Sequence, residues 1–248
     1  MKISVITVSY NAAKTIADTL FSVAGQSYSE VEHIIIDGAS EDATVSIAQD
    51  LLRMGGQLVS EPDQGLYDAM NKGIALATGD VIGLLNADDL YADPDVLYRV
   101  AEAFLKQSVD AVLGDVGFFQ DGFPDRIVRR YNSGRFRPSR IRWGWMPAHP
   151  AMFLTRKAYD RVGNYRTDFK IAADFEYVVR AFAKEKLSFV HIPDLLVKMR
   201  LGGISTSGLK ATLTINSESV RACRDNGIYT NLAMIMSKYP LKLLEYVR

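Results

Sequence analysis

Short apolar segments alternate with amphipathic ones through the first 115 residues, and this alternation limits the possible folds more than any other feature of the sequence. Between the apolar segments, residues such as Ile16, Leu20 and Val23 recur at helical spacing. The predicted strands lie at 3–8, 32–37, 57–60 and 81–85, with another starting at 111. Strands separated by helices predict an α/β fold with a mostly parallel, twisted sheet flanked by helices.

The pattern changes after residue 117. Gly, Pro, Arg and aromatic residues dominate up to Pro150, which predicts loops with short strands. The second half of the chain is then predicted to contain a helix at 175–182, strands at 187–191 and 195–199, and helices at 210–226 and 232–246, the last interrupted by Pro240. We expect one domain over residues 1–228, with halves at 1–115 and 116–208, and a helical tail at 229–248.

Composition excludes several classes of protein. The 248 residues are 48% apolar and carry 29 basic and 29 acidic side chains, which argues against nucleic-acid binding as the main activity. Cys223 is the single cysteine, so no internal disulfide forms and a reducing compartment is expected. The three histidines lack zinc-ligand spacing. No apolar run reaches the roughly 20 residues of a membrane-spanning helix, so we expect a cytoplasmic protein.

Polar side chains follow each of the first four predicted strands. Ligands of parallel α/β sheets bind beyond the carboxyl ends of the strands, so these positions are the first candidates for a site. They are Ser9-Tyr10-Asn11, Asp37-Gly38-Ala39-Ser40, Glu61-Pro62-Asp63 and Asn86-Ala87-Asp88-Asp89.

The acidic end of the fourth strand has two interpretations. Carboxylates at a strand end suit Mg²⁺ or Mn²⁺, with substrate phosphates completing the coordination shell. An Asp pair is equally common in turns and helix caps, and the pattern alone does not separate the two. Similarly, Asp37 suits a nucleobase N–H, and the Tyr10 ring suits either base stacking or packing. Asp68, Asn71 and Lys72 share one helical face that is directed either toward the site or toward solvent.

Taken together in their order and spacing, these segments resemble family 2 glycosyltransferases of the GT-A fold. The resemblance covers residues 3–115 through Ile3 to Asn11, Ile36 to Asp42, Gly65 to Gly73 and Leu85 to Asp89. A weaker similarity to bacterial polysaccharide-assembly members continues through His149-Pro150, Ala173 to Glu176 and Gly202 to Ser205.

The resemblance implies an inverting transfer from a UDP- or GDP-sugar to a saccharide or lipid-linked acceptor, in bacterial surface polysaccharide synthesis. Residues 1–115 would then bind the nucleotide-sugar and 116–208 the acceptor. Tyr10 and Asp37 would hold the nucleobase, with backbone help from Thr7 and Val8. The implied donor site comprises Thr7, Val8, Tyr10, Asn11, Asp37, Ser40, Asp68, Asn71, Asn86, Ala87 and Asp88.

The resemblance also implies catalytic roles. Asp88 matches the second acid of the family's DxD motif and would bind Mn²⁺ or Mg²⁺, while Asn86 stands where the first acid is usual. Asp174 falls at the position of the catalytic base. Without the resemblance, a carboxylate in the first turn of a helix is more often simply favoured by the helix dipole.

Seven arginines and both tryptophans gather between Arg126 and Trp145. Guanidinium groups pair with phosphate and aromatic faces stack on sugars, so we expect an acceptor or diphosphate site there; a solvated basic face is the alternative. Its candidate residues are Arg137, Arg140, Trp143, Trp145 and His149. The tail at 232–246 is expected to pack on the domain or on a second subunit of a homo-oligomer, or to lie on the inner face of the cytoplasmic membrane.

Two other functions stay open at this point. A sugar-1-phosphate nucleotidyltransferase is also α/β and metal-dependent, but it needs a Gly-rich loop after the first strand, where this chain has Ser9-Tyr10-Asn11-Ala12-Ala13. A nucleotide-sugar-binding protein that is catalytically weak is the second, favoured by Asn86 and opposed by Asp88 and Asp174.

Overall fold

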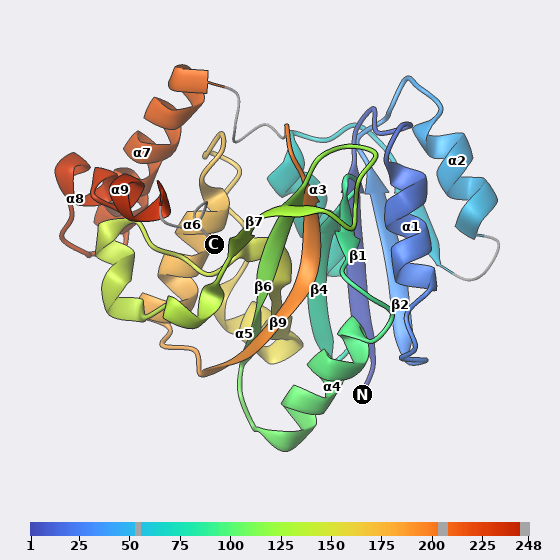
Figure 1. Ribbon diagram of the computed structural model, residues 1–248, viewed down its shortest axis with the longest axis horizontal. Helices are drawn as coiled ribbons and strands as arrows, with labels where there is room; N and C mark the ends of the chain where they lie inside the picture. The colour runs from blue at the N-terminus through green and yellow to red at the C-terminus, as the bar shows by residue number, and fades with distance from the viewer. Residues whose placement is uncertain (53–55, 203–207, 244–248) are drawn as a thin grey trace.

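The computed structural model describes residues 1–52, 56–202 and 208–243, and it contains a curled mixed sheet flanked by helices (Figure 1). The first half contains β1 Ile3–Ser9, α1 Ile16–Ala24, β2 Val31–Asp37, α2 Thr44–Leu51, β3 Gln57–Ser60, α3 Leu66–Leu76, β4 Val81–Asn86, β5 Asp89–Tyr91, α4 Val96–Lys106 and β6 Ala111–Phe119. The second half contains β7 Ile127–Tyr131, the 3₁₀ helices η2 Ser133–Arg135, η3 Pro138–Trp143 and η4 His149–Ala151, then β8 Met152–Thr155, α5 Arg156–Val162, α6 Ala173–Val178, the π-helix η5 Val179–Lys184, β9 Phe189–Arg200, α7 Gly208–Asp225, α8 Leu232–Met236 and α9 Lys238–Leu243.

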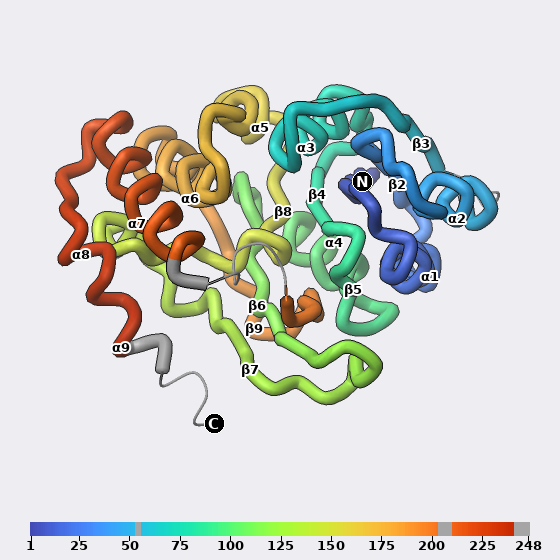
Figure 2. Tube along the Cα trace, turned by 90° about the horizontal axis from the view of Figure 1, so that it is seen from above, coloured from blue at the N-terminus to red at the C-terminus, as the bar shows by residue number. Residues whose placement is uncertain are grey.

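The parallel part of the sheet has the order β3-β2-β1-β4, as the alternating pattern predicts. Its strands are rich in buried apolar residues because helices cover both faces. Ile34 and Ile36 belong to the apolar cluster on the side of α3, whereas Ile35 between them belongs to the cluster with α1 and α2. Figure 2 shows the same two layers from above, with α3 and α5 on one side of the strands and α1 and α4 on the other.

The second half adds antiparallel pairs to this sheet. β8 pairs antiparallel with both β4 and β6, so the two halves of the chain share one sheet. The remaining strands extend from β6: β7 is antiparallel to it and β9 is parallel to it, and β5 pairs antiparallel with β9. The mostly parallel arrangement therefore holds for the first half, and the whole sheet is mixed.

Strand β9 corrects one prediction, because the segments expected as two strands at 187–191 and 195–199 form a single strand. Pro193 lies inside it and cannot donate to the ladder, but the β6–β9 register shifts between Leu113 and Val116 and absorbs the irregularity. The strand runs alongside β6 over most of its length (Figure 1).

The C-terminal helices form a separate layer beside α6 (Figure 2). The predicted helix at 232–246 is divided at Ser237 into α8 and α9, and Pro240 lies in the first turn of α9, where no backbone donor is needed. Residues 244–246 of that prediction lie outside the described residues. None of the described helices is long and apolar enough to span a membrane.

Candidate active site

The carboxyl ends of four parallel strands meet at one edge of the sheet, as the sequence predicts. The strand register places Ser9 of β1 beside Asp37 of β2, and Asp37 beside Ser60 of β3. Val8 is the register partner of Asn86 at the end of β4. The polar segments that follow these strands are therefore close neighbours.

The Asp37 carboxylate joins three of these strand ends. It is fully buried, and it accepts hydrogen bonds from the hydroxyls of Ser9 (3.0 Å), Ser40 (2.5 Å) and Ser60 (2.8 Å). The backbone N–H of Ser40 donates to it as well, at 2.8 Å. Four protein donors therefore hold the carboxylate that is expected to bind a nucleobase, and in this arrangement it joins the segments that end β1, β2 and β3.

Tyr10 and Asn11 occupy the loop after β1. The Tyr10 side chain is 65% exposed, so its ring is available for stacking. Asn11 has a left-handed φ of 49° and joins the first two loops: its N–H donates to the Ser40 hydroxyl at 2.8 Å, and its side-chain oxygen accepts from the Glu41 N–H at 3.0 Å. The placement of both residues fits the wall of a base pocket.

Thr7 and Val8, whose backbones are expected to contact the nucleobase, have contacts inside the sheet, and their role at a nucleobase stays a prediction. Thr7 is fully buried within β1, and its hydroxyl lies 2.9 Å from Nε2 of His33. The carbonyl of Val8 accepts from the N–H of Ala87 at 3.2 Å. Because β1 is an interior strand paired on both sides, its backbone groups are used by its neighbours before the strand ends.

Asp63 follows β3 at one of the candidate strand ends, but the sequence analysis assigned it no role. Its Oδ1 accepts from the N–H of Gly65, ahead of α3, at 2.7 Å. A Cβ at Gly38 would lie only 2.6 Å from its Oδ2. The carboxylate thus lies against the backbone that follows Asp37, where an added methyl group would displace it. Its signal was its place at the end of β3, beside Glu61.

The end of β4 gathers Asn86, Asp88 and Asp89. Asp88 is partly buried and Asp89 almost fully, and burial raises the pKa of both carboxyls. The Asn86 amide nitrogen donates to Asp89 at 3.2 Å, whereas its side-chain oxygen is buried without a hydrogen-bond partner. Ala87, between them, packs in the apolar cluster with Ile16 of α1.

This group fits a divalent cation. A buried amide oxygen that lacks a donor and two carboxylates destabilised by burial are hard oxygen ligands that Mg²⁺ or Mn²⁺ would satisfy. The described part of the chain holds no cluster of three or more Asp, Glu, His or Cys with ligating geometry, so substrate oxygens would have to complete the shell. The side-chain oxygen of Asn86 is therefore available, next to the Asp88 carboxylate, as a ligand for a cation that also binds a diphosphate.

Arg200, at the end of β9, supplies positive charge beside these acids. Its guanidinium pairs with Asp18 at 3.1 Å and with Asp121, and its charge lowers the pKa of both Asp88 and Asp89. Sequence reasoning missed it because it reaches the β4 end only through the β5–β9 pairing. Residues 203–207, which include part of the Gly202 to Ser205 motif, lie outside the described residues.

Helix α3 connects the donor loops to the second half of the chain. Asn71 was expected to face the donor, but its side chain forms two 2.8 Å hydrogen bonds with the backbone N–H and C=O of Tyr165. Asp68 accepts from the N–H of Gln64 at 3.1 Å, and Lys72 pairs with Glu61 at 2.8 Å. The polar stripe of α3 is therefore used in holding neighbouring loops.

Asp174 lies in the first turn of α6, at the same edge as the donor loops. Tyr67 in the first turn of α3 donates to the carbonyl of Ile171, three residues before Asp174. Burial raises the pKa of Asp174 to about 6, while the N–H of Phe175, which donates to its Oδ1 at 2.7 Å, and the charge of Lys238 lower it. A carboxylate with such a pKa is suited to accept a proton near neutral pH.

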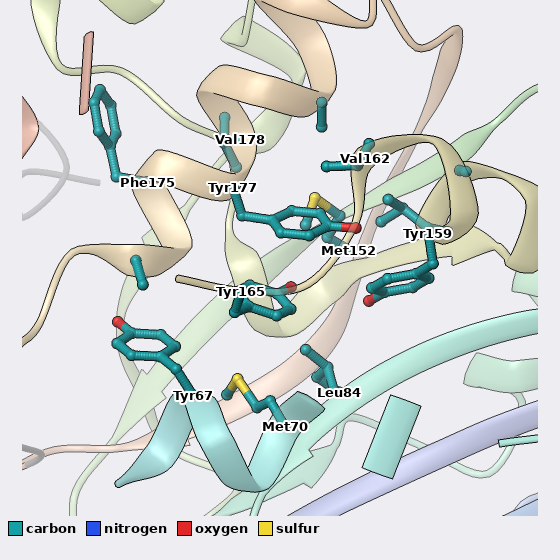
Figure 3. Packing of buried hydrophobic residues seen from close by; sticks show 14 of the residues in the cluster. Tyr67, Met70, Leu84, Met152, Tyr159, Val162, Tyr165, Phe175, Tyr177 and Val178 are labelled. Atoms are coloured by element: carbon teal, nitrogen blue, oxygen red, sulfur yellow. The ribbon is translucent and has the colours of Figure 1, made fainter. Parts of the chain in front are cut away.

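His149 lies below this edge, in a cluster of tyrosines. Its Nε2 is 2.8 Å from the hydroxyl of Tyr165, and burial lowers its pKa to about 4, so the ring is neutral near pH 7. Figure 3 shows Tyr165 between Tyr67 and Tyr177. Its ring stacks on both, with centroids 6.1 Å from Tyr67 and 4.2 Å from Tyr177. The structure places His149 in this core layer, and its contact with a diphosphate or an acceptor stays a prediction.

The arginine-rich segment forms β7, η2 and η3. Arg137 donates to the carbonyls of Gly134 and Phe136, and Arg140 is exposed. Trp143 is 43% exposed at the end of η3, and Trp145 is partly buried just beyond. Beside η3 lies a cavity of about 480 Å³ lined by Pro138, Ser139, Arg142, Phe182, Ala183, Lys186, Leu187 and Ile228. The lining of this cavity does not include Asp174.

Comparison with known proteins places the chain among enzymes that transfer sugars. The family described as glycosyl transferase family 2 matches residues 4–163. An uncharacterized glycosyltransferase of Mycobacterium tuberculosis is 34% identical over 187 residues, covering 72% of this chain and 68% of the relative. A PGL/p-HBAD biosynthesis glycosyltransferase of the same species is 33% identical over 199 residues, covering 76% and 73%.

Solved structures share the fold. S. aureus TarS 1-349 in complex with UDP-GlcNAc is similar over 100% of this chain and 72% of that chain, with a TM-score of 0.71 and 17% identity. The mannosyltransferase PcManGT of Pyrobaculum calidifontis, in complex with GDP-Man and Mn²⁺, is similar over 99% and 73%, with a TM-score of 0.66 and 18% identity. With these architectures and the sequence relatives in agreement, the chain belongs to glycosyl transferase family 2.

Proposed function

We propose that the protein transfers a sugar, with inversion, from a nucleotide-diphosphate sugar to a hydroxyl of a saccharide or lipid-linked saccharide in bacterial surface polysaccharide synthesis. One observation carries the proposal: a carboxylate with a pKa of about 6, Asp174, lies at the sheet edge where the acidic end of β4 also lies. Asp174 is suited to accepting a proton, and the acidic end of β4 is suited to binding a diphosphate. Together they are the two groups that a direct sugar transfer needs.

The donor half of this site is built from the loops after β1, β2 and β4. Tyr10 presents an exposed ring for a base, and the Asp37 network fixes the loops on either side of it. Asn86 and Asp88 would hold Mn²⁺ or Mg²⁺, which stabilises the charge that develops on the departing diphosphate. Arg200 adds a fixed cation next to the same acids. Either a UDP- or a GDP-sugar suits this arrangement.

The transfer step is a single displacement. The acceptor oxygen forms a bond to the anomeric carbon as the bond to the diphosphate oxygen breaks, and the hydroxyl proton passes to Asp174. The nucleoside diphosphate leaves with the electron pair. Attack from the face opposite the leaving group inverts the anomeric configuration, and no covalent enzyme intermediate is required.

A thermal-shift screen tests this function. UDP, GDP and their sugars are added to the protein with and without Mn²⁺, since a ligand that binds only the folded state raises the melting temperature. We expect one diphosphate class to stabilise the protein, and to do so more strongly with Mn²⁺. Absence of any response to either class would contradict the proposal.

We further propose that the face formed by η3, the turn before α8 and α8 contacts an anionic membrane surface. Its exposed apolar side chains are Trp143, Tyr229, Leu232 and Met236, and its exposed cations include Arg140 and Arg142. Helix α8 packs directly on η3, and the Thr230 hydroxyl donates to the Arg142 carbonyl at 2.6 Å, so these elements form one surface. Aromatic residues mixed with cations are typical of membrane interfaces.

Co-sedimentation with vesicles tests this face. Vesicles of phosphatidylglycerol and phosphatidylcholine are expected to bind the protein, and vesicles of phosphatidylcholine alone to bind it weakly. Arg142→Glu should weaken binding to the anionic vesicles at least about fivefold, because each surface cation contributes about 1 kcal/mol. Arg126→Glu, an exposed arginine between β6 and β7, is the matched control. Equal loss in both variants would contradict the assignment of this face.

A further inference from the structure

One acidic side chain of α7 holds the loop that leads into α6. The Glu218 carboxylate accepts three consecutive backbone amides: Oε1 from Lys170 at 2.7 Å, and Oε2 from Ile171 at 3.0 Å and Ala172 at 2.9 Å. Hydrogen bonds to an ionised acceptor are stronger than those between neutral groups. Three on one carboxylate fix the direction of the chain immediately before α6 begins.

The same loop is held from the opposite side by α3. The Tyr67 hydroxyl donates to the carbonyl of Ile171, so this single peptide is fixed at its N–H by α7 and at its C=O by α3. Tyr67 is buried and stacks on Tyr165, which Figure 3 shows between Tyr67 and Tyr177 of α6. The loop therefore has little freedom to move.

Two further residues of α7 hold the earlier part of the loop. Arg221 pairs with Asp168, and Asp225 pairs with Arg166 at 2.7 Å. Both guanidinium groups lie over the ring of Phe169, at 4.5 and 4.7 Å from its centroid. These contacts are largely exposed and anchor the loop, but they lie further from Asp174 in the chain than the contacts of Glu218 do.

The start of α6 shows why Glu218 matters. The residue at its N-cap is Ala172, whose side chain cannot accept from the helix amides, and α6 itself runs only from Ala173 to Val178. Asp174 is the second residue of this short helix, so its direction depends on how the preceding backbone is held. Glu218 accepts from the N–H of this N-cap residue and from the two amides before it, so it fixes the backbone that enters the helix.

We propose that Glu218 is a positioning residue for Asp174, and that its contacts with the 170–172 amides aim the Asp174 carboxylate at the acceptor hydroxyl. This inference rests on the proposed function, in which Asp174 is the base. Neither the family motifs nor the expectation that ligands bind beyond the carboxyl ends of parallel strands points to Glu218. It lies far along the chain, in a helix without site motifs.

A second consequence concerns the titration of the base. The charged or titratable groups that face Asp174 are Tyr67 of α3, Tyr165 of the loop, Glu218 of α7 and Lys238 of α9. The negative charge of Glu218 raises the pKa of Asp174, and the positive charge of Lys238 lowers it. Neutralising Glu218 should therefore let Asp174 ionise at lower pH.

The test compares Glu218→Gln and Glu218→Ala with Arg221→Ala, which removes an exposed ion pair from the same helix and the same loop. Transfer is measured as kcat and donor KM across pH, with the melting temperature of each variant. A misplaced base should lower kcat by roughly 10- to 100-fold, because small displacements of a reacting group cost that much. Donor KM should be unchanged, and the acidic limb of the Glu218→Gln profile should move to lower pH. Arg221→Ala should keep its kcat and its pH profile.

The possible outcomes distinguish a failure of this inference from a failure of the proposed function. If Asp174→Asn retains transfer, the proposed base fails and the role of Glu218 fails with it. If Asp174→Asn is inactive but Glu218→Gln keeps its kcat within about twofold and its acidic limb in place, the positioning role alone is overturned. A lower melting temperature with an unchanged pH profile would mark Glu218 as purely structural and would overturn it too. If Glu218→Ala does not fold, the Gln variant decides.

Discussion

Replacing Asp174 with Asn should stabilise the protein at neutral pH, at the same time as it removes transfer activity. The carboxylate of Asp174 is held in a site whose burial raises its pKa to about 6. Its ionised form is therefore less favourable in the folded state than in the unfolded chain. An Asn side chain has nearly the same shape, and its oxygen can still accept from the N–H of Phe175, which lies 2.7 Å from Oδ1.

The magnitude follows from the change in pKa between the two states. A shift from 3.8 to about 6 corresponds, at about 1.36 kcal/mol for each pKa unit, to about 3 kcal/mol. This is an upper value, because the side chain keeps some contact with solvent. For a chain of this size it corresponds to an increase in Tm of at most about 6 to 12 °C.

The sign of the pH dependence is fixed by the direction of the shift. Above pH 6, Asp174 is ionised in both states, and the folded state bears the full cost of its charge. Below pH 3.8 it is protonated in both states, and the cost vanishes. The advantage of the Asn variant should thus fall from about 3 kcal/mol at pH 7.5 to about 1 kcal/mol at pH 4.5.

Urea unfolding of the two proteins at a series of pH values measures this difference. Asp168→Asn is the matched control: Asp168 is exposed, and the hydrogen bond from Arg166 holds its pKa below the usual range, so its neutralisation should give no gain in stability at pH 7.5. An Asp174→Asn variant that is no more stable than the wild type at pH 7.5 would refute the reasoning. A gain that is equal at both pH values would refute the electrostatic cause.

Three further predictions follow from the site and the core. Transfer by the wild type should lose about tenfold in kcat/KM between pH 7 and pH 5, as Asp174 is protonated through a pKa of about 6; a flat profile would exclude it as the base. Gly73→Ala should destabilise the fold by about 1 to 3 kcal/mol in urea unfolding, because the new Cβ would lie 2.3 Å from Ile6 Cγ2. Glu176→Ala should cost about 3 to 5 kcal/mol, since it leaves the Arg180 guanidinium partly buried without its carboxylate; Glu176→Gln should cost less, and equal losses would count against the charge pairing.

The donor half of the fold could be predicted because its determinants are local. Strands β1, β2 and β4 are short segments rich in β-branched and other apolar residues, and the helices between them show regular spacing. Parallel strands then bring their carboxyl ends to one edge without any further information. That rule located Tyr10, Asp37 and Asp88 together, and the structure confirms that they share this edge.

The contacts within the site could not be predicted, because they join residues far apart in the chain. The residues next to Asp37 in the sequence do not indicate that the hydroxyls of Ser9 and Ser60 donate to its carboxylate. Those hydrogen bonds depend on the register of the strands. Glu218 reaches its three amides across 46 to 48 positions, and β8 finds its place between β4 and β6 only through tertiary packing. Strand β9 was predicted as two strands, because the register shift that joins them across Pro193 depends on the pairing with β6.

Calorimetric titration of UDP and GDP, with and without Mn²⁺, into the wild type and Asp88→Ala tests the central claim most directly. The account places the donor diphosphate at the end of β4, against the buried oxygen of Asn86 and the carboxylate of Asp88. It predicts that one nucleoside diphosphate binds the wild type more tightly with Mn²⁺, and that Asp88→Ala loses this dependence on the metal while its fold is unchanged. An Asp88→Ala variant with the same metal-dependent affinity as the wild type would contradict the account.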